Sequence, residues 1–590
     1  MSLMENQNVI YGINGPVVTV KNARSFSMME MVFVGHERLV GEIIGINDKF
    51  TTIQVYEETT GLTLGEPIYG TGSPMNVTLG PGIMSNIFDG IERPLKEIAK
   101  ESGTFINRGS TASALDEEKL WDVTLKVQVG DTLKSGDVYA EVPETLSVLH
   151  KCMLTPLIPT ATVTKVMPNG QYKVHDTVVE VEDANGKKHE LTLCQRWPIR
   201  NARPVSKRTT STVPLITGQR IQDALFPITK GGTACIPGAF GSGKTMTQHQ
   251  LAKWCDADII IYVGCGERGN EMTQVLEEFA ELIDPRTNRL LTDRTVLIAN
   301  TSNMPVAARE ASIYTGITLA EYYRDMGYHV AMMADSTSRW AEALREISGR
   351  LEEMPAEEGF PAYLPSRLAE FYERAGYVHN LNGTEGSISV IGAISPAGGD
   401  FSEPVTQNTM RFTRCFWALD KSLAYARHFP AIDWMASYTE YLNDLEPWYI
   451  EHLGEEYLEY RSVINNLLQE ENKLMEIVKL VGADVLPDDQ KLVIQIARVI
   501  RIGFLQQNAF HPDDTYVPIE KQRDMMKVIV HLYNKSKQIV AANVPLDDLL
   551  STGLYERIIK MKYEVPNNKL EMFDNIIDDI DRTIAGVLNA

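Results

Sequence analysis

Residues 238–245 match the phosphate-binding loop pattern G-x-x-x-x-G-K-[ST] at every fixed position. The glycines of that pattern let consecutive backbone N–H groups face phosphate oxygens, and the helix that follows adds the positive end of its dipole. A strand-like run at 233–236 precedes the loop and a helical run at 246–254 follows it. We therefore expect a strand–loop–helix unit that binds a triphosphate through Gly238, Ala239, Phe240, Gly241, Ser242, Gly243, Lys244 and Thr245.

Two side chains of this loop and one later carboxylate suit a bound Mg²⁺-triphosphate. Lys244 is expected to reach the β and γ phosphates, and the hydroxyl of Thr245 to ligate the Mg²⁺ that bridges them. Asp335 closes an apolar strand at 330–334, where a carboxylate on the Mg²⁺ side belongs. Asp335 can alternatively be the N-cap of a helix that starts near Ser338, and both interpretations can hold together.

Between about 198 and 434 the sequence alternates apolar strands with longer helical segments, which is typical of a parallel sheet covered by helices. We expect strands at 259–263 and 295–299, a helix at 271–283, and a further helix that runs through 322. The carboxyl ends of such strands form the edge where open α/β sheets bind ligands. The phosphate loop is expected at that edge.

Residues 264–269 also match G-x-G-x-x-G, the dinucleotide-binding pattern. Against that interpretation, Glu267 would repel a pyrophosphate, and Asp284 follows a helical run instead of a second strand. We expect instead that Glu267, at the end of the strand adjoining the phosphate loop, orients a water for in-line attack on the γ phosphorus. The alternative is a surface glutamate paired with Arg268.

Bulk properties exclude several function classes. A chain of 590 residues should hold several domains, and its net charge of −22 argues against nucleic-acid binding. The 6 cysteines show no zinc-like spacing, the histidines form no metal-binding cluster, and a reduced compartment is expected. The first ten residues do not resemble a signal peptide, and we find no apolar run of membrane-spanning length. The chain is expected to be cytoplasmic, with any membrane role exerted through partners.

The flanking regions differ in type. Short β-type runs from 9 to 71 predict a small barrel, and a second β-rich region at 110–197 predicts a separate module. Its Gly-Asp turns leave open a carrier role for Lys151 as an alternative, although Lys151 lacks the methionine-flanked setting of a carrier lysine. Beyond 442 the segments are helical, with long runs at 453–480 and 489–507.

Taken together, the chain resembles the catalytic A subunit of V-type and archaeal-type rotary ATPases over essentially its whole length. The segments that carry the resemblance are 237–245, 262–273, 300–310, 333–340 and 395–400. The inserted module separates this family from the catalytic β subunit of F-type ATP synthases. The complete phosphate loop separates it from the non-catalytic B subunit.

The resemblance implies a multidomain α/β fold with a RecA-like P-loop core. It implies an N-terminal β-barrel at 1–75, a nucleotide-binding domain at 76–109 and 198–440, an inserted β-rich module at 110–197, and a helical C-terminal domain at 441–590.

The resemblance also implies the site residues. ATP or ADP would lie on the phosphate loop, with Mg²⁺ held by Thr245 and Asp335. Glu267 and Lys244 would be catalytic, with Arg268 as a neighbouring phosphate-sensing residue. The adenine would pack against two aromatic side chains, Phe429 and Phe510.

The implied partners are B subunits in an A3B3 ring, central and peripheral stalks, and a membrane sector that carries H⁺ or Na⁺. A trans arginine would come from a B subunit. One alternative is a ring component that holds nucleotide without turning it over, which would need the loop but not Glu267. Another is an RNA-translocating hexamer, which the acidic composition disfavours.

Overall fold

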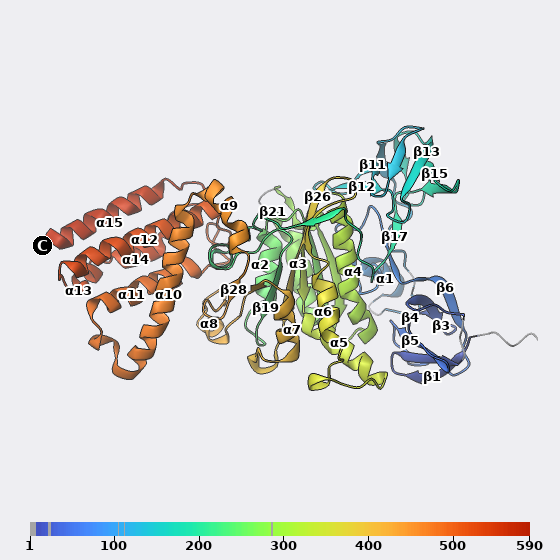
Figure 1. Ribbon diagram of the computed structural model, residues 1–590, viewed down its shortest axis with the longest axis horizontal. Coiled ribbons are helices and arrows are strands. Elements are labelled where there is room, and N and C mark those ends of the chain that lie inside the picture. Colours follow the sequence, from blue (N-terminus) through green and yellow to red (C-terminus); the bar gives the residue numbers. More distant parts are fainter. Residues whose placement is uncertain (1–7, 22–24, 104–105, 111, 285–286, 590) are drawn as a thin grey trace, which may run out of the picture.

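The computed structural model describes residues 8–21, 25–103, 106–110, 112–284 and 287–589. An α/β core occupies the middle of the elongated molecule (Figure 1). A helical domain forms one end, and two β-rich parts, drawn in blue and cyan, lie at the other end.

The core is built on one sheet with the strand order β28-β27-β19-β26-β24-β20-β23-β8. All neighbouring pairs from β27 to β8 are parallel. Strands buried on both faces need near-continuous apolar sequence, as seen here. The strands along this path are β8 (Ile87–Phe88), β19 (Thr233–Pro237), β20 (Ile259–Glu267), β23 (Thr295–Thr301), β24 (His329–Asp335), β26 (Glu385–Ile394), β27 (Cys415–Phe416) and β28 (Tyr438–Thr439). Two further strands, β25 (Gly376–His379) and β18 (Lys207–Thr209), extend the sheet antiparallel from β26.

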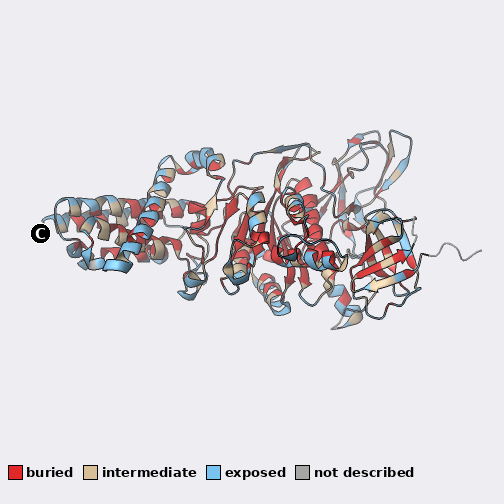
Figure 2. Cartoon of the chain, turned by 60° about the horizontal axis from the view of Figure 1, so that its bottom comes forward, coloured by how far each residue is buried: buried red, intermediate tan, exposed pale blue. Residues whose placement is uncertain are grey.

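Helices cover both faces of this sheet, so its strands are buried (Figure 2). Alternate residues of β20 belong to two different hydrophobic clusters: Ile261 packs with the cluster of α4 and α5, and Ile260 with that of α2 and α3. These helices are α2 (Lys244–Trp254), α3 (Gly269–Glu281), α4 (Val306–Asp325) and α5 (Thr337–Arg350), followed by α6 (Leu364–Tyr372), α7 (Pro404–Phe412) and α8 (Lys421–Tyr425).

Two sequence-based expectations for the core are wrong. The helix expected at 271–283 ends at Glu281, because the next residues form the short strand β21 (Ile283–Asp284) paired with β22 (Arg289–Leu290). The strand that carries Glu267 does not adjoin the strand before the phosphate loop, because β26 and β24 lie between β19 and β20. After α2 the chain forms β20, and the strands that separate β20 from β19, β24 and β26, come later in the sequence.

The N-terminal part is an antiparallel barrel with the strand order β1-β2-β5-β4-β3-β6. It closes where Ile10 N–H donates to Glu66 O at 2.9 Å and Ile68 N–H donates to Asn8 O at 2.8 Å. This is the small barrel predicted from the short β-type runs between 9 and 71. The bounds are β1 (Ile10–Asn14), β2 (Val17–Lys21), β3 (Glu30–Val34), β4 (Leu39–Ile46), β5 (Phe50–Val55) and β6 (Ile68–Pro74).

The inserted module is attached through a paired neck of β7 (Asn76–Leu79) and β17 (Gln195–Pro198). It contains two antiparallel sheets, β10-β13-β15-β16 and β12-β11-β9-β14. Their strands are β9 (Trp121–Leu125), β10 (Thr132–Lys134), β11 (Val138–Pro143), β12 (Leu149–Met153), β13 (Thr160–Val166), β14 (Gly170–Tyr172), β15 (Val179–Asp183) and β16 (Lys188–Leu191).

The structure disfavours a carrier role for this module. Lys151 lies within β12, and its Nζ donates to Met326 O at 2.8 Å, directly after α4. A carrier lysine must stand free at a turn to receive its prosthetic group, whereas this one ties the module to the core.

The C-terminal domain is helical, and the helix predicted at 489–507 is only partly α-helical. It ends as an α-helix at Val499 and continues as a π-type segment, Ile500–Leu505. The helices are α9 (Leu442–Leu453), α10 (Glu456–Val481), α11 (Asp488–Val499), α12 (Ile519–Ala541), α13 (Leu546–Ser551), α14 (Leu554–Glu564) and α15 (Met572–Asn589). Among the described residues we find no helix with the length and apolar character needed to traverse a bilayer.

Candidate nucleotide-binding site

The phosphate loop joins β19 to α2, as its sequence predicts. Gly241 and Gly243 have φ values of 81° and 92°, a region that side chains with a Cβ rarely adopt. The Nζ of Lys244 donates to Gly238 O at 2.9 Å and to Ala239 O at 3.3 Å, so the lysine folds back across the loop. Burial lowers the pKa of Lys244, partly offset by the nearby carboxylates of Asp335 and Glu267.

Thr245 and Asp335, which are far apart in sequence, meet beside the loop. The Thr245 hydroxyl donates to Asp335 Oδ2 at 2.9 Å, and the Tyr262 hydroxyl donates to the same oxygen at 3.2 Å. Burial raises the pKa of Asp335, and these hydrogen bonds oppose that shift. Ser336, not Asp335, occupies the N-cap position of α5, so the capping interpretation is wrong.

These donors fit Mg²⁺. A hydroxyl and a carboxylate are oxygen ligands, and Mg²⁺ is usually held by one or two protein groups together with phosphates and water. Among the described residues there is no cluster of three or more His, Cys, Asp or Glu side chains arranged as an all-protein metal site. The arrangement therefore suits a metal that arrives with its nucleotide.

Glu267 ends β20, the strand beside β24, which ends at Asp335. Burial, followed by the charges of Asp335 and Glu271, raises the pKa of Glu267 to about 8. A carboxyl group whose pKa is raised in this way is a candidate acid–base or water-orienting group. Sequence reasoning missed Glu271, which lies in the first turn of α3, shortly after Glu267. The close spacing of these two carboxylates in the sequence was the available signal.

Arg268 lies against the phosphate loop. Its guanidinium carbon is 4.8 Å from the ring centroid of Phe240, which is itself a loop residue. This contact gives Arg268 a partner other than Glu267, so the structure does not support the alternative in which the two form a surface ion pair. It also places a positive charge beside the expected phosphates.

Phe429 and Phe510, which are distant in sequence, line one cavity of about 800 Å³ next to the loop. A Cβ on Gly243 would lie 3.7 Å from Cε1 of Phe429. The cavity is also lined by Met246 of α2 and by Tyr563 of α14, a residue that sequence reasoning missed. Large aromatic side chains left 43% and 95% exposed at Phe429 and Phe510 suit a planar ligand that covers them.

We expect Phe429→Ala and Phe510→Ala each to weaken ADP binding by about 1–3 kcal/mol, the usual loss when an aromatic partner of a stacked base is removed. Isothermal titration with ADP measures the effect. Tyr425→Ala is the control, because Tyr425 is exposed but does not line the cavity. Unchanged affinity in both phenylalanine variants would contradict a base-binding role.

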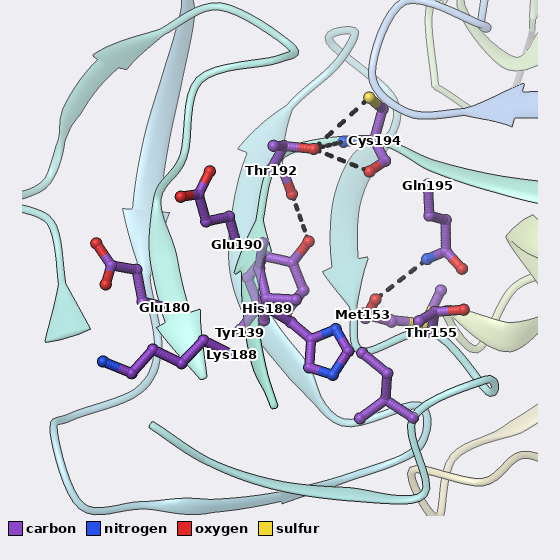
Figure 3. Close-up of a pocket in the computed structure, with 12 residues that line it drawn as sticks. Tyr139, Met153, Thr155, Glu180, Lys188, His189, Glu190, Thr192, Cys194 and Gln195 are labelled. Carbon is purple, nitrogen blue, oxygen red and sulfur yellow. Dashed lines mark hydrogen bonds between the residues drawn. The ribbon is translucent and has the colours of Figure 1, made fainter. Parts of the chain in front are cut away.

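A second cavity, of about 520 Å³, lies in the inserted module (Figure 3). The hydrogen bonds drawn there join its lining residues to one another: Gln195 Nε2 donates to Met153 O at 3.1 Å, and Thr192 Oγ1 donates to Cys194 O at 3.0 Å. Gln195 and Thr192 of this cavity are thus bonded within the module, whereas the cavity beside the phosphate loop presents exposed aromatic faces.

Known families match four consecutive parts of the chain. Residues 218–439 match the nucleotide-binding domain of the ATP synthase alpha/beta family, and residues 10–72 match the beta-barrel domain of that family. Residues 112–200 match the ATP synthase alpha/beta subunit barrel-sandwich domain. Residues 446–550 match the C-terminal domain of V and A type ATP synthase. The predicted fold class is confirmed.

Individual relatives are similar over nearly their whole lengths. The chain is 59% identical to the V-type ATP synthase alpha chain of Halothermothrix orenii, over 98% of each chain. It is 56% identical to the A subunit of the A-type ATP synthase of Methanopyrus kandleri, over 95% of each.

A solved structure of the assembled ATPase EscN from the type III secretion system of enteropathogenic E. coli matches with a TM-score of 0.63. It is 19% identical and covers 89% of this chain and 100% of that one, which shows a shared fold. From the extent and identity of the closer matches, the chain belongs to the family of V-type ATP synthase alpha chains and A-type ATP synthase A subunits.

Proposed function

We propose that this chain is the catalytic subunit of a rotary V/A-type ATPase and carries out Mg²⁺-dependent ATP hydrolysis or synthesis. The observation that carries the proposal is the hydrogen bond between Thr245 and Asp335 beside a complete phosphate loop, at the sheet edge where Glu267 also lies. A loop that only held nucleotide would not need the half-buried carboxyl group of Glu267 at that edge.

The residues divide the chemistry between them. Backbone N–H groups of the loop and the ammonium of Lys244 bind the β and γ phosphates, once Lys244 exchanges its carbonyl partners for phosphate oxygens. Thr245 and Asp335 would hold Mg²⁺, which would supply positive charge to the phosphate oxygens. Glu267 orients the attacking water, and Arg268 contacts the phosphate end. Phe429 and Phe510 enclose the adenine.

The family membership favours an A3B3 ring with B subunits, joined to central and peripheral stalks and to a membrane sector that carries H⁺ or Na⁺. The chain would then associate with a membrane only through that complex. The division into parts at 1–75, 76–109 with 198–440, 110–197 and 441–590 is supported by the separate sheets of the barrel, the core and the module. A trans arginine from a B subunit would complete the site.

The test is ATPase activity of the purified chain with and without its B partner. We expect the chain alone to turn over ATP at least about 10²-fold more slowly than the assembled ring, because a trans arginine can contribute 10³-fold or more. High turnover by the isolated chain would contradict a shared site. A ring that binds ATP without turning it over would favour the non-catalytic alternative.

A further inference from the structure

The main chain of Glu267 is held by the turn that follows β23. The Ser302 N–H donates to Glu267 O at 2.9 Å. The pairing of β20 with β23 shifts register between Cys265 and Glu267, and Glu267 forms the last pair of the ladder, with Thr301. Its position therefore depends on where this turn is anchored.

Arg309, in the first turns of α4, anchors that turn. Its Nη2 donates to Ser302 O at 3.0 Å. Ser302 therefore accepts a hydrogen bond from Arg309 with its C=O and donates one to Glu267 with its N–H. The carbonyl of Arg309 also accepts the Cys265 thiol, with Sγ at 3.4 Å. Arg309 thus contacts the strand directly at Cys265, and it reaches Glu267 through Ser302.

The guanidinium of Arg309 also packs against Gly266. Gly266 has a φ of 71°, and a Cβ built there would lie 3.0 Å from both Cδ and Nε of Arg309. The Nε of Arg309 is buried and has no hydrogen-bond partner among the described residues. A buried charged donor without a partner costs free energy, and its retention in a native structure calls for an explanation such as a functional role.

The next residue, Glu310, fixes the same helical turn to the β-barrel. Its carboxylate accepts two hydrogen bonds from Arg200, at 3.0 and 2.8 Å, and Arg200 also donates to Glu42 of β4 at 2.9 Å. Glu42 and Glu310 are almost fully buried. Bidentate contacts of this kind fix the relative positions of the groups that they join. The first turn of α4, which carries Arg309, is therefore held in place against the β-barrel.

We propose that Arg309 is a positioning residue for Glu267: it holds the turn at Ser302, and that turn holds the backbone of the water-orienting glutamate. The inference rests on the proposed role of Glu267. Arg309 would act on turnover and not on nucleotide affinity, because it is tied to the Glu267 side of the site and does not line the aromatic cavity.

The test uses the ring assembled from the full chain and its partner subunits, with steady-state turnover and equilibrium ADP binding measured in parallel. Arg309→Gln is expected to lower kcat at least about tenfold, since small misplacements of a reacting group cost up to 10²-fold. Its ADP affinity should stay within about threefold of wild type. Arg309→Lys keeps the positive charge but has a single donor nitrogen in place of the forked guanidinium. Its kcat should fall at least about threefold, but less than that of Arg309→Gln.

Arg374→Gln is the matched control. Arg374 is buried and donates to Glu321 of the same helix at 3.0 and 2.7 Å, but at the end away from Glu267. Arg309→Gln and Arg374→Gln should both lower the melting temperature, and only Arg309→Gln should lower turnover. An equal loss of turnover in the two variants, or a loss of ADP affinity in proportion to the loss of turnover in Arg309→Gln, would overturn the proposal.

Three further outcomes separate a failure of the role proposed for Arg309 from a failure of the role proposed for Glu267. If Arg309→Gln does not assemble, a loss of less than about threefold in Arg309→Lys overturns the inference. If Glu267→Gln is inactive while Arg309→Gln is fully active, this inference alone fails. If Glu267→Gln keeps full turnover, the proposed function fails and the inference falls with it.

Discussion

Glu267→Gln in the assembled ring is expected to reduce steady-state ATP turnover by at least about 10²-fold, the scale on which an electrostatic or positioning group in a transition state acts. The amide has the size of the carboxyl group but cannot accept a proton from the attacking water. Nucleotide binding should persist, because the loop, Lys244 and the aromatic cavity are unchanged. Phosphate release and ADP titration on the same preparation separate the two effects. Full turnover would exclude Glu267 from the reaction.

The same variant carries its own folding control. Because burial and neighbouring carboxylates raise the pKa of Glu267 to about 8, the folded apo chain binds this proton more tightly than the unfolded chain does. Folding is therefore progressively opposed as the pH rises from the ordinary pKa of a glutamate toward 8. A neutral glutamine avoids that penalty. Glu267→Gln should raise the melting temperature more at pH 8 than at pH 5. A melting temperature below that of wild type at pH 8 would argue against a raised pKa of Glu267.

Lys244→Ala is expected to weaken ATP binding by about 3 kcal/mol, or about 10²-fold, because charge-assisted hydrogen bonds to the β and γ phosphates are lost. Turnover should become undetectable. In the structure Lys244 bonds only to the carbonyls of Gly238 and Ala239 among the described residues, so its removal breaks no ion pair of the fold.

Lys253→Ala is the matched control for that variant. Lys253 lies at the other end of α2 and pairs with Glu278 at 2.9 Å, so it shares the helix but not the loop. It should bind ATP as wild type does. Equal losses of affinity in both variants would mean that the helix, and not contact with phosphate, is responsible. Titration with ATP in the presence of Mg²⁺ measures both.

The features that could be predicted from sequence are local. The phosphate loop depends on glycines at fixed spacing, and it forms the expected strand–loop–helix unit. All the residues that determine this unit are close together in the sequence. Asp335 and Glu267 could be named because each closes an apolar strand. The resemblance to the V/A family supplied Phe429 and Phe510, whose shared cavity no local pattern would reveal.

The errors and omissions arise where distant segments meet. β26 and β24 come later in the chain but insert between β19 and β20, because strand order depends on crossover connections and packing instead of sequence order. Tyr262, Tyr563 and Arg309 gain their importance only from contacts with residues elsewhere in the sequence.

By itself, then, the sequence determined that this chain carries a complete phosphate loop with two strand-end carboxyl groups, and which family it resembles. Short-range spacing encodes those features directly. Only the tertiary structure decided that the Thr245 hydroxyl bonds Asp335 across the sheet, that Phe429 and Phe510 share a cavity, and that the start of α4 holds the backbone of Glu267. Such contacts form when helices and strands bury their apolar faces against one another, which places residues of distant sequence within hydrogen-bonding distance.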